Sequence, residues 1–263
     1  MSYKENTMIA NYHAHTPLCR HATGALTDYV ENAISRGLEV FGFSDHAPQW
    51  FPGKYYSHMR MYPHQLQEYC QQVRQLAHTY KEKIQIPLGL EAEYYPQIFP
   101  RLLQEARDAG IEYFLLGQHW VGNEENEPYA GDANNSESLL QRYCTQVADA
   151  LQTGVFSYIA HPDLIHFRGD PKIYDRHMRW LCREAKAADT PLELNFLGMV
   201  NNRHYPTDAF WKIAGEEGCS VVFGIDAHHP DHMLDLQVER SAIRMAERFG
   251  LKVVPTVSLR KIG

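Results

Sequence analysis

Histidines that follow short apolar stretches are the residues in this sequence with the clearest capacity for chemistry. The chain has 15 histidines among 263 residues, and imidazole both titrates near neutral pH and binds transition metals. His13 and His15 are two residues apart at the end of one such stretch. At a strand end, residues with this spacing point to the same side, so both rings can reach one metal ion.

The same arrangement recurs along the chain. Several other apolar runs are followed by a histidine, and two carboxylates occupy equivalent positions: His46, His119, His161, His228, Glu91 and Asp226. One histidine at a strand end is usually a structural residue, but repetition at so many strand ends indicates a metal site. Ligands that are mostly imidazoles favour Zn, Mn or Fe over Ca and Mg, which prefer oxygen.

These side chains can come together only if the strands that carry them end on the same side of the fold. Short apolar runs alternate with longer amphipathic stretches, which predicts strand–helix units and a parallel sheet. We expect strands at 8–13, 38–45, 84–91, 113–118, 155–160, 192–195 and 221–225. We expect helices at 27–36, 63–80, 100–109, 173–188, 208–217 and 235–249, and one between the N-cap Ser136 and Gly154.

Seven strand–helix units fit either a barrel or a doubly wound sheet, and periodicity does not separate the two. A barrel turns every carboxyl end toward one mouth, whereas a flat sheet does so only near its switch point. The distribution of the histidines therefore favours a (β/α)7 barrel. No linker or low-complexity tract interrupts the pattern, so we expect residues 1–263 to form a single α/β domain.

Composition narrows the class of protein. With 44% hydrophobic and 22% charged residues, the chain has an ordinary globular composition. The net charge is −7 and there is no basic run, so we expect no nucleic-acid partner. The five cysteines lack any CxxC spacing, which predicts free thiols and a cytoplasmic location. No apolar stretch is long enough for a membrane helix, and the sequence does not indicate an oligomeric state.

The ordered motifs resemble those of the PHP family, named for polymerase and histidinol phosphatase domains. They read HAHTPLCRHA from His13, then FSDHAP, GLEAE, GQH, AHPD and GIDAHH, and they extend from residue 13 to residue 229. The resemblance implies a distorted seven-stranded β/α barrel. It also adds His21, the third histidine of an HxHxxxxxH pattern, to the expected ligands.

The resemblance further implies how the ligands are shared among two to three divalent transition-metal ions. His13, His15, Glu91 and Asp226 would hold the first ion, Glu91, His119 and His161 the second, and His21, His46 and His228 the third. Two ions that share a carboxylate can hold a bridging hydroxide and clamp a phosphoester for in-line displacement. We therefore assign catalytic roles to Glu91, Asp226 and His228. Geometry alone does not exclude Glu93 as the bridge, but the resemblance favours Glu91.

A chain of this length with the SDHAP and AHPD motifs is similar to the histidinol-phosphatase branch of the family. That resemblance implies a metal-dependent phosphomonoesterase that converts L-histidinol phosphate to L-histidinol and phosphate in histidine biosynthesis. Action on nucleotides or DNA ends stays open, because metal ligands do not encode the leaving group. A non-catalytic metal-binding barrel would be expected to lack ligands, and all nine are present. An amidohydrolase-like barrel typically has a lysine where this chain reads Gly117-Gln118-His119.

A phosphate monoester also needs donors besides the metal ions. Arg168 and Arg203 follow the fifth and sixth expected strands and can fork onto phosphate oxygens. His229 points away from its neighbour His228 and either contacts the substrate or packs. Five loop aromatics either line a pocket or cap the rim: Trp50, Tyr55, Tyr56, Trp120 and Tyr129. Asp45 and Asp163 are expected to orient imidazoles or to pair locally.

Overall fold

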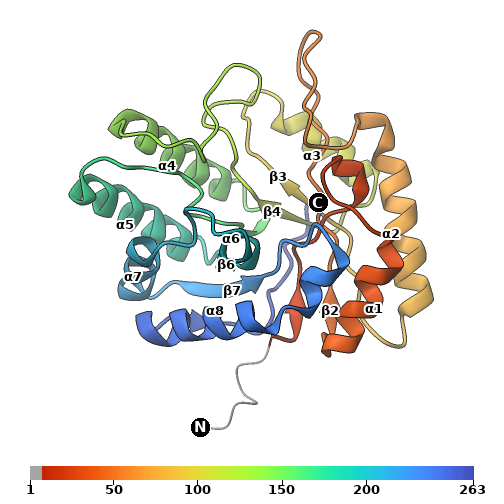
Figure 1. Ribbon diagram of the computed structural model, residues 1–263. Coiled ribbons are helices and arrows are strands. Elements are labelled where there is room, and N and C mark those ends of the chain that lie inside the picture. Colours follow the sequence, from red (N-terminus) through yellow and green to blue (C-terminus); the bar gives the residue numbers. More distant parts are fainter. Residues whose placement is uncertain (1–7) are drawn as a thin grey trace.

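The computed structural model describes residues 8–263, so residues 1–7 of the predicted domain lie outside the described part. Helices surround a central group of parallel strands (Figure 1). The strands are β1 (Ala10–Asn11), β2 (Val40–Phe41), β3 (Gly89–Ala92), β4 (Tyr113–Leu116), β5 (Phe156–Ile159), β6 (Leu192–Asn195), β7 (Ser220–Gly224) and β8 (Lys252–Val253). The parallel α/β architecture predicted from the sequence is confirmed.

All the predicted long helices are present. They are α1 (Leu26–Arg36), α2 (Leu66–Tyr80), α3 (Phe99–Asp108), α4 (Glu137–Gln152), α5 (Pro171–Ala187), α7 (Asp208–Glu217) and α8 (Leu236–Phe249), with short α6 (Phe196–Val200) between β6 and α7. Ser136 caps α4 by accepting the Leu139 N–H, as its position predicts. Gly154 follows α4 with φ at +71°, which suits a residue without a Cβ. Neither α6 nor β8 was predicted, because both are too short to show a period.

The strands form two parallel sheets, and the finer prediction of a distorted (β/α)7 barrel is not confirmed. β1 pairs with β2, and β3 to β8 pair in chain order. Isolated bridges at Phe43–Leu88 and His46–Glu91 link the segment after β2 to β3, and an Ala14–Ala227 bridge links the segments that follow β1 and β7. No closed barrel is detected in residues 8–263. β8 pairs with the amino end of β7, so β1 reaches β7 only beyond its carboxyl end.

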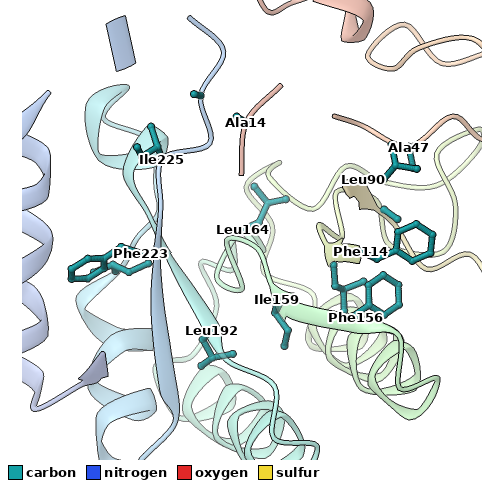
Figure 2. Packing of buried hydrophobic residues seen from close by; sticks show 14 of the residues in the cluster. Ala14, Ala47, Leu90, Phe114, Phe156, Ile159, Leu164, Leu192, Phe223 and Ile225 are labelled. Atoms are coloured by element: carbon teal, nitrogen blue, oxygen red, sulfur yellow. The ribbon is translucent and has the colours of Figure 1, made fainter. Parts of the chain in front are cut away.

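The main core lies between the strands and the helices that cover them. β3, β4, β5 and β6 are buried along their whole length, as expected for parallel strands covered by helices. Figure 2 shows Phe114 of β4 beside Phe156 of β5, with ring centroids 6.0 Å apart. Phe99 of α3 stacks on Phe156 at 5.5 Å, which anchors that helix to the sheet.

A second, smaller core lies on the opposite face of the strands. It contains Ala10, Tyr12, Tyr113, Leu115, Tyr158 and Val222, and the C-terminal residues Val254, Val257 and Leu259 pack against it. The Val257 N–H donates to the Tyr12 hydroxyl at 3.4 Å, and the Arg260 N–H donates to the Ser157 hydroxyl at 3.0 Å. The C-terminal segment therefore covers the amino ends of the strands and is part of the fold.

We expect Ile262→Ala to lower the free energy of unfolding by about 2–5 kcal/mol, because this side chain near the C-terminus is only 2% exposed. Val253→Ala, at a side chain 36% exposed, is the matched control and should cost far less. Urea unfolding of both variants measures the difference. Equal losses would mean that the C-terminal segment does not dock as described.

All five cysteines are free and buried, in agreement with the prediction of unbridged thiols. Among the described residues, every helix is too short or too polar to cross a membrane.

Candidate metal centre

The predicted ligands gather where the strands end. Glu91 belongs to β3, and the others follow β1, β2, β4, β5 and β7 by two to five residues, except His21, which is ten residues beyond β1. The buried members are His13, His15, His46, Glu91, His119, His161 and Asp226. His228 is half-buried and His21 is exposed at the edge of the group. All nine residues that the sequence singles out are therefore brought to one end of the fold.

Glu91 lies at the centre of the group. Its Oε1 is 2.8 Å from His161 Nε2 and 3.6 Å from His119 Nε2. Its Oε2 is 2.9 Å from His46 Nδ1, and the Nε2 atoms of His13 and His15 lie at 3.5 and 3.6 Å. The two carboxylate oxygens thus face different histidines, which is the arrangement that a carboxylate shared by two ions requires.

Asp226 faces the first histidine pair from the other side. Its Oδ1 lies 3.1 Å from His15 Nε2, 3.5 Å from His13 Nε2 and 3.4 Å from His228 Nδ1. Asp226 has φ at +54° and His161 has φ at +30°, values that residues with a Cβ rarely adopt. Such strain is typical of functional sites, where the surrounding structure holds it in place.

His21 completes the outer edge of the group. Its Nε2 lies 3.0 Å from His228 Nε2, while its Nδ1 contacts the Cys19 carbonyl oxygen at 2.9 Å. Two imidazole nitrogens that face each other this closely can share a proton or a metal ion. Ligand atoms of His15, His46 and His228 also lie within 4.8 Å of one another.

Several buried atoms of the candidate ligands make no contact with hydrogen-bond geometry, although other ligand atoms lie 2.9–3.6 Å away. They include Nε2 of His13 and of His15, Nδ1 of His46 and Oδ1 of Asp226. An unpaired polar atom in the interior costs free energy, so such groups are normally paired or bound to a metal. Since these atoms converge and their donor set is mainly imidazole, the residues fit divalent transition-metal ions.

The electrostatics of the group set its protonation. Burial alone would raise the pKa of Glu91, but neighbouring histidines, His119 and His46 above all, hold it well below its usual range. Burial likewise opposes a charged His15, yet Asp226 and Asp45 raise its pKa to about 9. For His228, burial and the nearby His15 lower the pKa to about 3. Glu91 therefore stays ionised and His228 stays neutral, the forms that bind metal, whereas His15 carries a proton that a metal ion would displace.

A surrounding layer of carboxylates fixes the histidine rings, and the sequence predicted only part of it. Glu193 Oε1 lies 2.7 Å from His13 Nδ1, and Glu193 Oε2 accepts the His161 N–H at 3.0 Å. Such partners set the tautomer and orientation of a ligand. Sequence reasoning missed Glu193, although a charged residue within the apolar strand β6 is a signal that could have found it.

Asp45 and Glu93 belong to the same layer, whereas Asp163 does not. Asp45 Oδ1 lies 3.3 Å from His15 Nδ1, as predicted for an orienting carboxylate. Glu93 contacts His119 Nδ1 at 2.9 Å and pairs with Arg60, which distinguishes it from the central Glu91. Asp163 instead accepts the Thr207 N–H at 2.6 Å, and burial raises its pKa to about 7.

Two glycines make room for the buried carboxylates. A Cβ at Gly117 would lie 1.9 Å from Glu91 Oε1, and a Cβ at Gly224 would lie 1.8 Å from Glu193 Oε1. These distances are far inside van der Waals contact, so any side chain at either position would displace a carboxylate.

A cavity of about 720 Å³ opens onto the histidines. Arg203, His229, Trp120 and Tyr129 line it, and for the last three this agrees with one of the two alternatives that the sequence left open. Arg203 is an exposed residue of this lining, and its Nη1 donates to the Tyr205 hydroxyl at 3.0 Å. The remaining aromatic candidates, Trp50, Tyr55 and Tyr56, are not among the lining residues. His58, Met59 and His232 do line the cavity, and sequence reasoning had not selected them.

The structure does not bring Arg168 to the histidines. Its side chain is exposed and lines a separate cavity of about 370 Å³ together with His166 and His204. The reason is local, because the Arg168 N–H donates to the Asn134 carbonyl at 2.6 Å and holds this loop against its neighbour. The expectation that Arg168 shares the site with Arg203 is therefore not met.

The chain is similar to proteins of one family. Residues 11–196 match the PHP domain family. The probable histidinol-phosphatase of Deinococcus radiodurans is 29% identical over 234 residues, which cover 85% of this chain and 88% of the relative. The histidinol-phosphatase of Bacillus subtilis is 31% identical over 249 residues, with coverage of 82% and 92%.

A solved structure of a related enzyme has a similar fold. The crystal structure of a histidinol phosphate phosphatase from Lactococcus lactis, complexed with zinc, L-histidinol and phosphate, has a TM-score of 0.72 and 19% identity and covers 97% of both chains. With the family match over most of its length and the nine candidate ligands gathered at one end of the strands, this chain belongs to the PHP domain family.

Proposed function

We propose that this protein is a metal-dependent phosphomonoesterase that hydrolyses L-histidinol phosphate to L-histidinol and phosphate. The observation that carries the proposal is the buried group of unpartnered imidazole nitrogens and a carboxylate oxygen at the floor of a cavity that also contains Arg203. The relatives named histidinol-phosphatase, which align over most of the chain, supply the substrate.

The residues of the chain divide the work in this reaction. His13, His15, His21, His46, Glu91, His119, His161, Asp226 and His228 would hold the ions. When bound, such ions acidify water and neutralise charge on a phosphoryl group. Arg203 would donate to the phosphate oxygens and stabilise charge that develops during transfer. Trp120 and Tyr129 offer aromatic surface for the imidazole end of the substrate.

We propose two to three ions per chain, with Zn, Mn and Fe as the candidates. The donor set of seven imidazoles and two carboxylates supports these metals over Ca and Mg. The two oxygens of Glu91, which face different histidines, support a shared ligand between two of the ions.

We also propose a form for the strand arrangement and a cellular location. The isolated bridges at Ala14–Ala227 and His46–Glu91 support a distorted (β/α)7 barrel as the form in which the two sheets approach closure. The five free cysteines support a cytoplasmic location.

The experiment that tests the proposed function compares phosphate release from three substrates. Protein reconstituted separately with Mn, Fe and Zn is given L-histidinol phosphate, a nucleotide or a DNA with a terminal phosphate. The proposal expects histidinol phosphate to have the highest kcat/KM with at least one metal. Preference for the nucleotide or the DNA would assign the site to another phosphoester.

Removal of the metal is expected to abolish activity and to lower stability. Dialysis against a chelator should reduce kcat/KM by roughly 100-fold or more, because the ions supply the nucleophile and the charge neutralisation. It should also lower Tm, because the buried ligand atoms lose their partner. Elemental analysis before dialysis should find about two to three ions per chain. Activity that is indifferent to the chelator would reject the metal assignment.

A further inference from the structure

Arg60 is an arginine in a long loop whose side chain is nevertheless completely buried. It lies between β2 and α2, in the loop 48–63, and its exposed fraction is 0%. Its guanidinium donates to Glu93 twice, through Nη1 and Nη2 at 2.8 Å, and to the Ala47 carbonyl at 3.0 Å. It also donates to Glu124 Oε2, through Nε at 3.1 Å and Nη2 at 2.5 Å. Every nitrogen of the guanidinium is thus engaged.

One end of this network reaches the metal centre. Glu93 Oε1, which accepts from Arg60, also lies 2.9 Å from His119 Nδ1. A carboxylate on this side fixes the proton of the imidazole on Nδ1 and leaves Nε2, which faces Glu91, free to bind a metal. Arg60 in turn holds the Glu93 carboxylate in a bidentate pair, so it fixes the direction from which His119 is supported.

The other end of the network joins two walls of the cavity. Glu124 lies in the loop after β4, and its Oε1 accepts from the Tyr55 hydroxyl at 3.0 Å. Arg60 and Tyr55 therefore tie the loop 48–63 to the loop that contains Glu124. The first loop contributes His58 and Met59 to the cavity, and the second contributes Trp120 and Tyr129.

A buried ion pair is weak evidence for stability, because desolvation offsets most of the Coulombic gain. It does specify geometry, since a planar fork bound to two carboxylates has one arrangement. We propose that Arg60 is a positioning residue that fixes both the orientation of His119 and the spacing of the two cavity walls. The part that concerns substrate binding rests on the proposed function.

Two variants separate the two ends of the network. Glu124→Ala removes the tie between the loops and leaves the Arg60–Glu93–His119 contacts in place. We expect it to raise KM for histidinol phosphate about 10-fold, with kcat and metal content near those of the unmodified protein. Arg60→Lys keeps the charge and loses the fork, so it should also weaken metal retention by about 10- to 100-fold in competition with a chelator.

Arg142→Lys is the matched control. Arg142 belongs to α4, and its side chain, which is 48% exposed, pairs with Glu127 of the loop that follows β4. Its ion pair with Glu127 is separate from the contacts of Arg60 with Glu93 and Glu124. We expect Arg142→Lys to have the same KM and metal retention as the unmodified protein. Limited proteolysis should also cleave its loops 48–63 and 120–131 at the same rate. Glu124→Ala and Arg60→Lys should both be cleaved faster in these loops.

A merely structural role would lower Tm and the folded fraction and leave the KM of the folded protein unchanged. Unchanged KM and metal retention in Arg60→Lys would overturn the proposal, as would a Glu124→Ala variant that loses kcat and metal as strongly as affinity. Metal retention and proteolysis need no substrate. They test the role of Arg60 even if the unmodified protein fails to hydrolyse histidinol phosphate, a result that would refute the proposed function alone.

Discussion

Glu91→Gln is expected to lower kcat/KM by roughly 1000-fold or more while the protein remains folded. Both oxygens of Glu91 face histidines proposed to bind metal, and an amide offers one weakly coordinating oxygen and an NH2 group that repels cations. The variant should therefore retain less metal as well as less activity. Steady-state kinetics, elemental analysis and a thermal unfolding curve on the same preparation separate this effect from misfolding.

Glu105→Gln, on the exposed surface of α3, is the control for the same chemical change and should behave like the unmodified protein. If Glu91→Gln kept most of kcat together with its full complement of metal, the shared ligand would have to be another carboxylate. Glu93, two residues away, would then be the residue to test.

Arg203→Ala is expected to lower kcat/KM by about 2–4 kcal/mol, or roughly 30- to 1000-fold, with metal content unchanged. Arg203 is the arginine that lines the cavity with the candidate metal ligands, and its guanidinium can form charge-assisted hydrogen bonds with an anionic phosphoryl group. Arg203→Lys should recover only part of the loss, because lysine keeps the charge without the planar fork. Kinetics on histidinol phosphate and metal analysis measure both effects.

Arg168→Ala tests the placement found in the structure. The sequence predicts a phosphate contact for Arg168, whereas the structure puts it on a separate cavity, so its replacement should change kcat/KM by less than about 2-fold. A large loss in Arg168→Ala, with Arg203→Ala unaffected, would mean that the loop after β5 reorganises around the substrate and that Arg203 is not the phosphate donor.

The sequence predicted the strand and helix order because period and capping are local properties. Ser136 and Gly154 mark the ends of α4 through contacts within a few residues. Closure of the sheet is not local. β8 pairs with the amino end of β7, and the segment that follows β8 packs against Tyr12, so the contact between β1 and β7 depends on residues far apart in the sequence.

Eight of the nine candidate ligands were predictable because each is a polar residue at the end of an expected apolar strand, whereas His21 was added only by the resemblance of the motifs. The residues that orient these histidines were harder to predict. Glu193 is marked only as a charged residue in an otherwise apolar strand, and Arg60 lies in a loop with no motif. Arg168 and Arg203 were equivalent by position, and only the path of the loop, fixed by the contact of Arg168 with Asn134, separates them.

The meeting of the segments that follow β1 and β7 has a consequence for biosynthesis. His15 and Ala227 are joined by a backbone hydrogen bond of 2.8 Å, and Asp226 faces His15 across the site. At 5–20 residues per second, the ribosome adds Asp226 roughly 10–40 s after His15. The early histidines are therefore synthesised well before the residues that face them. The complete set of candidate ligands can assemble only after His228 has been added to the chain.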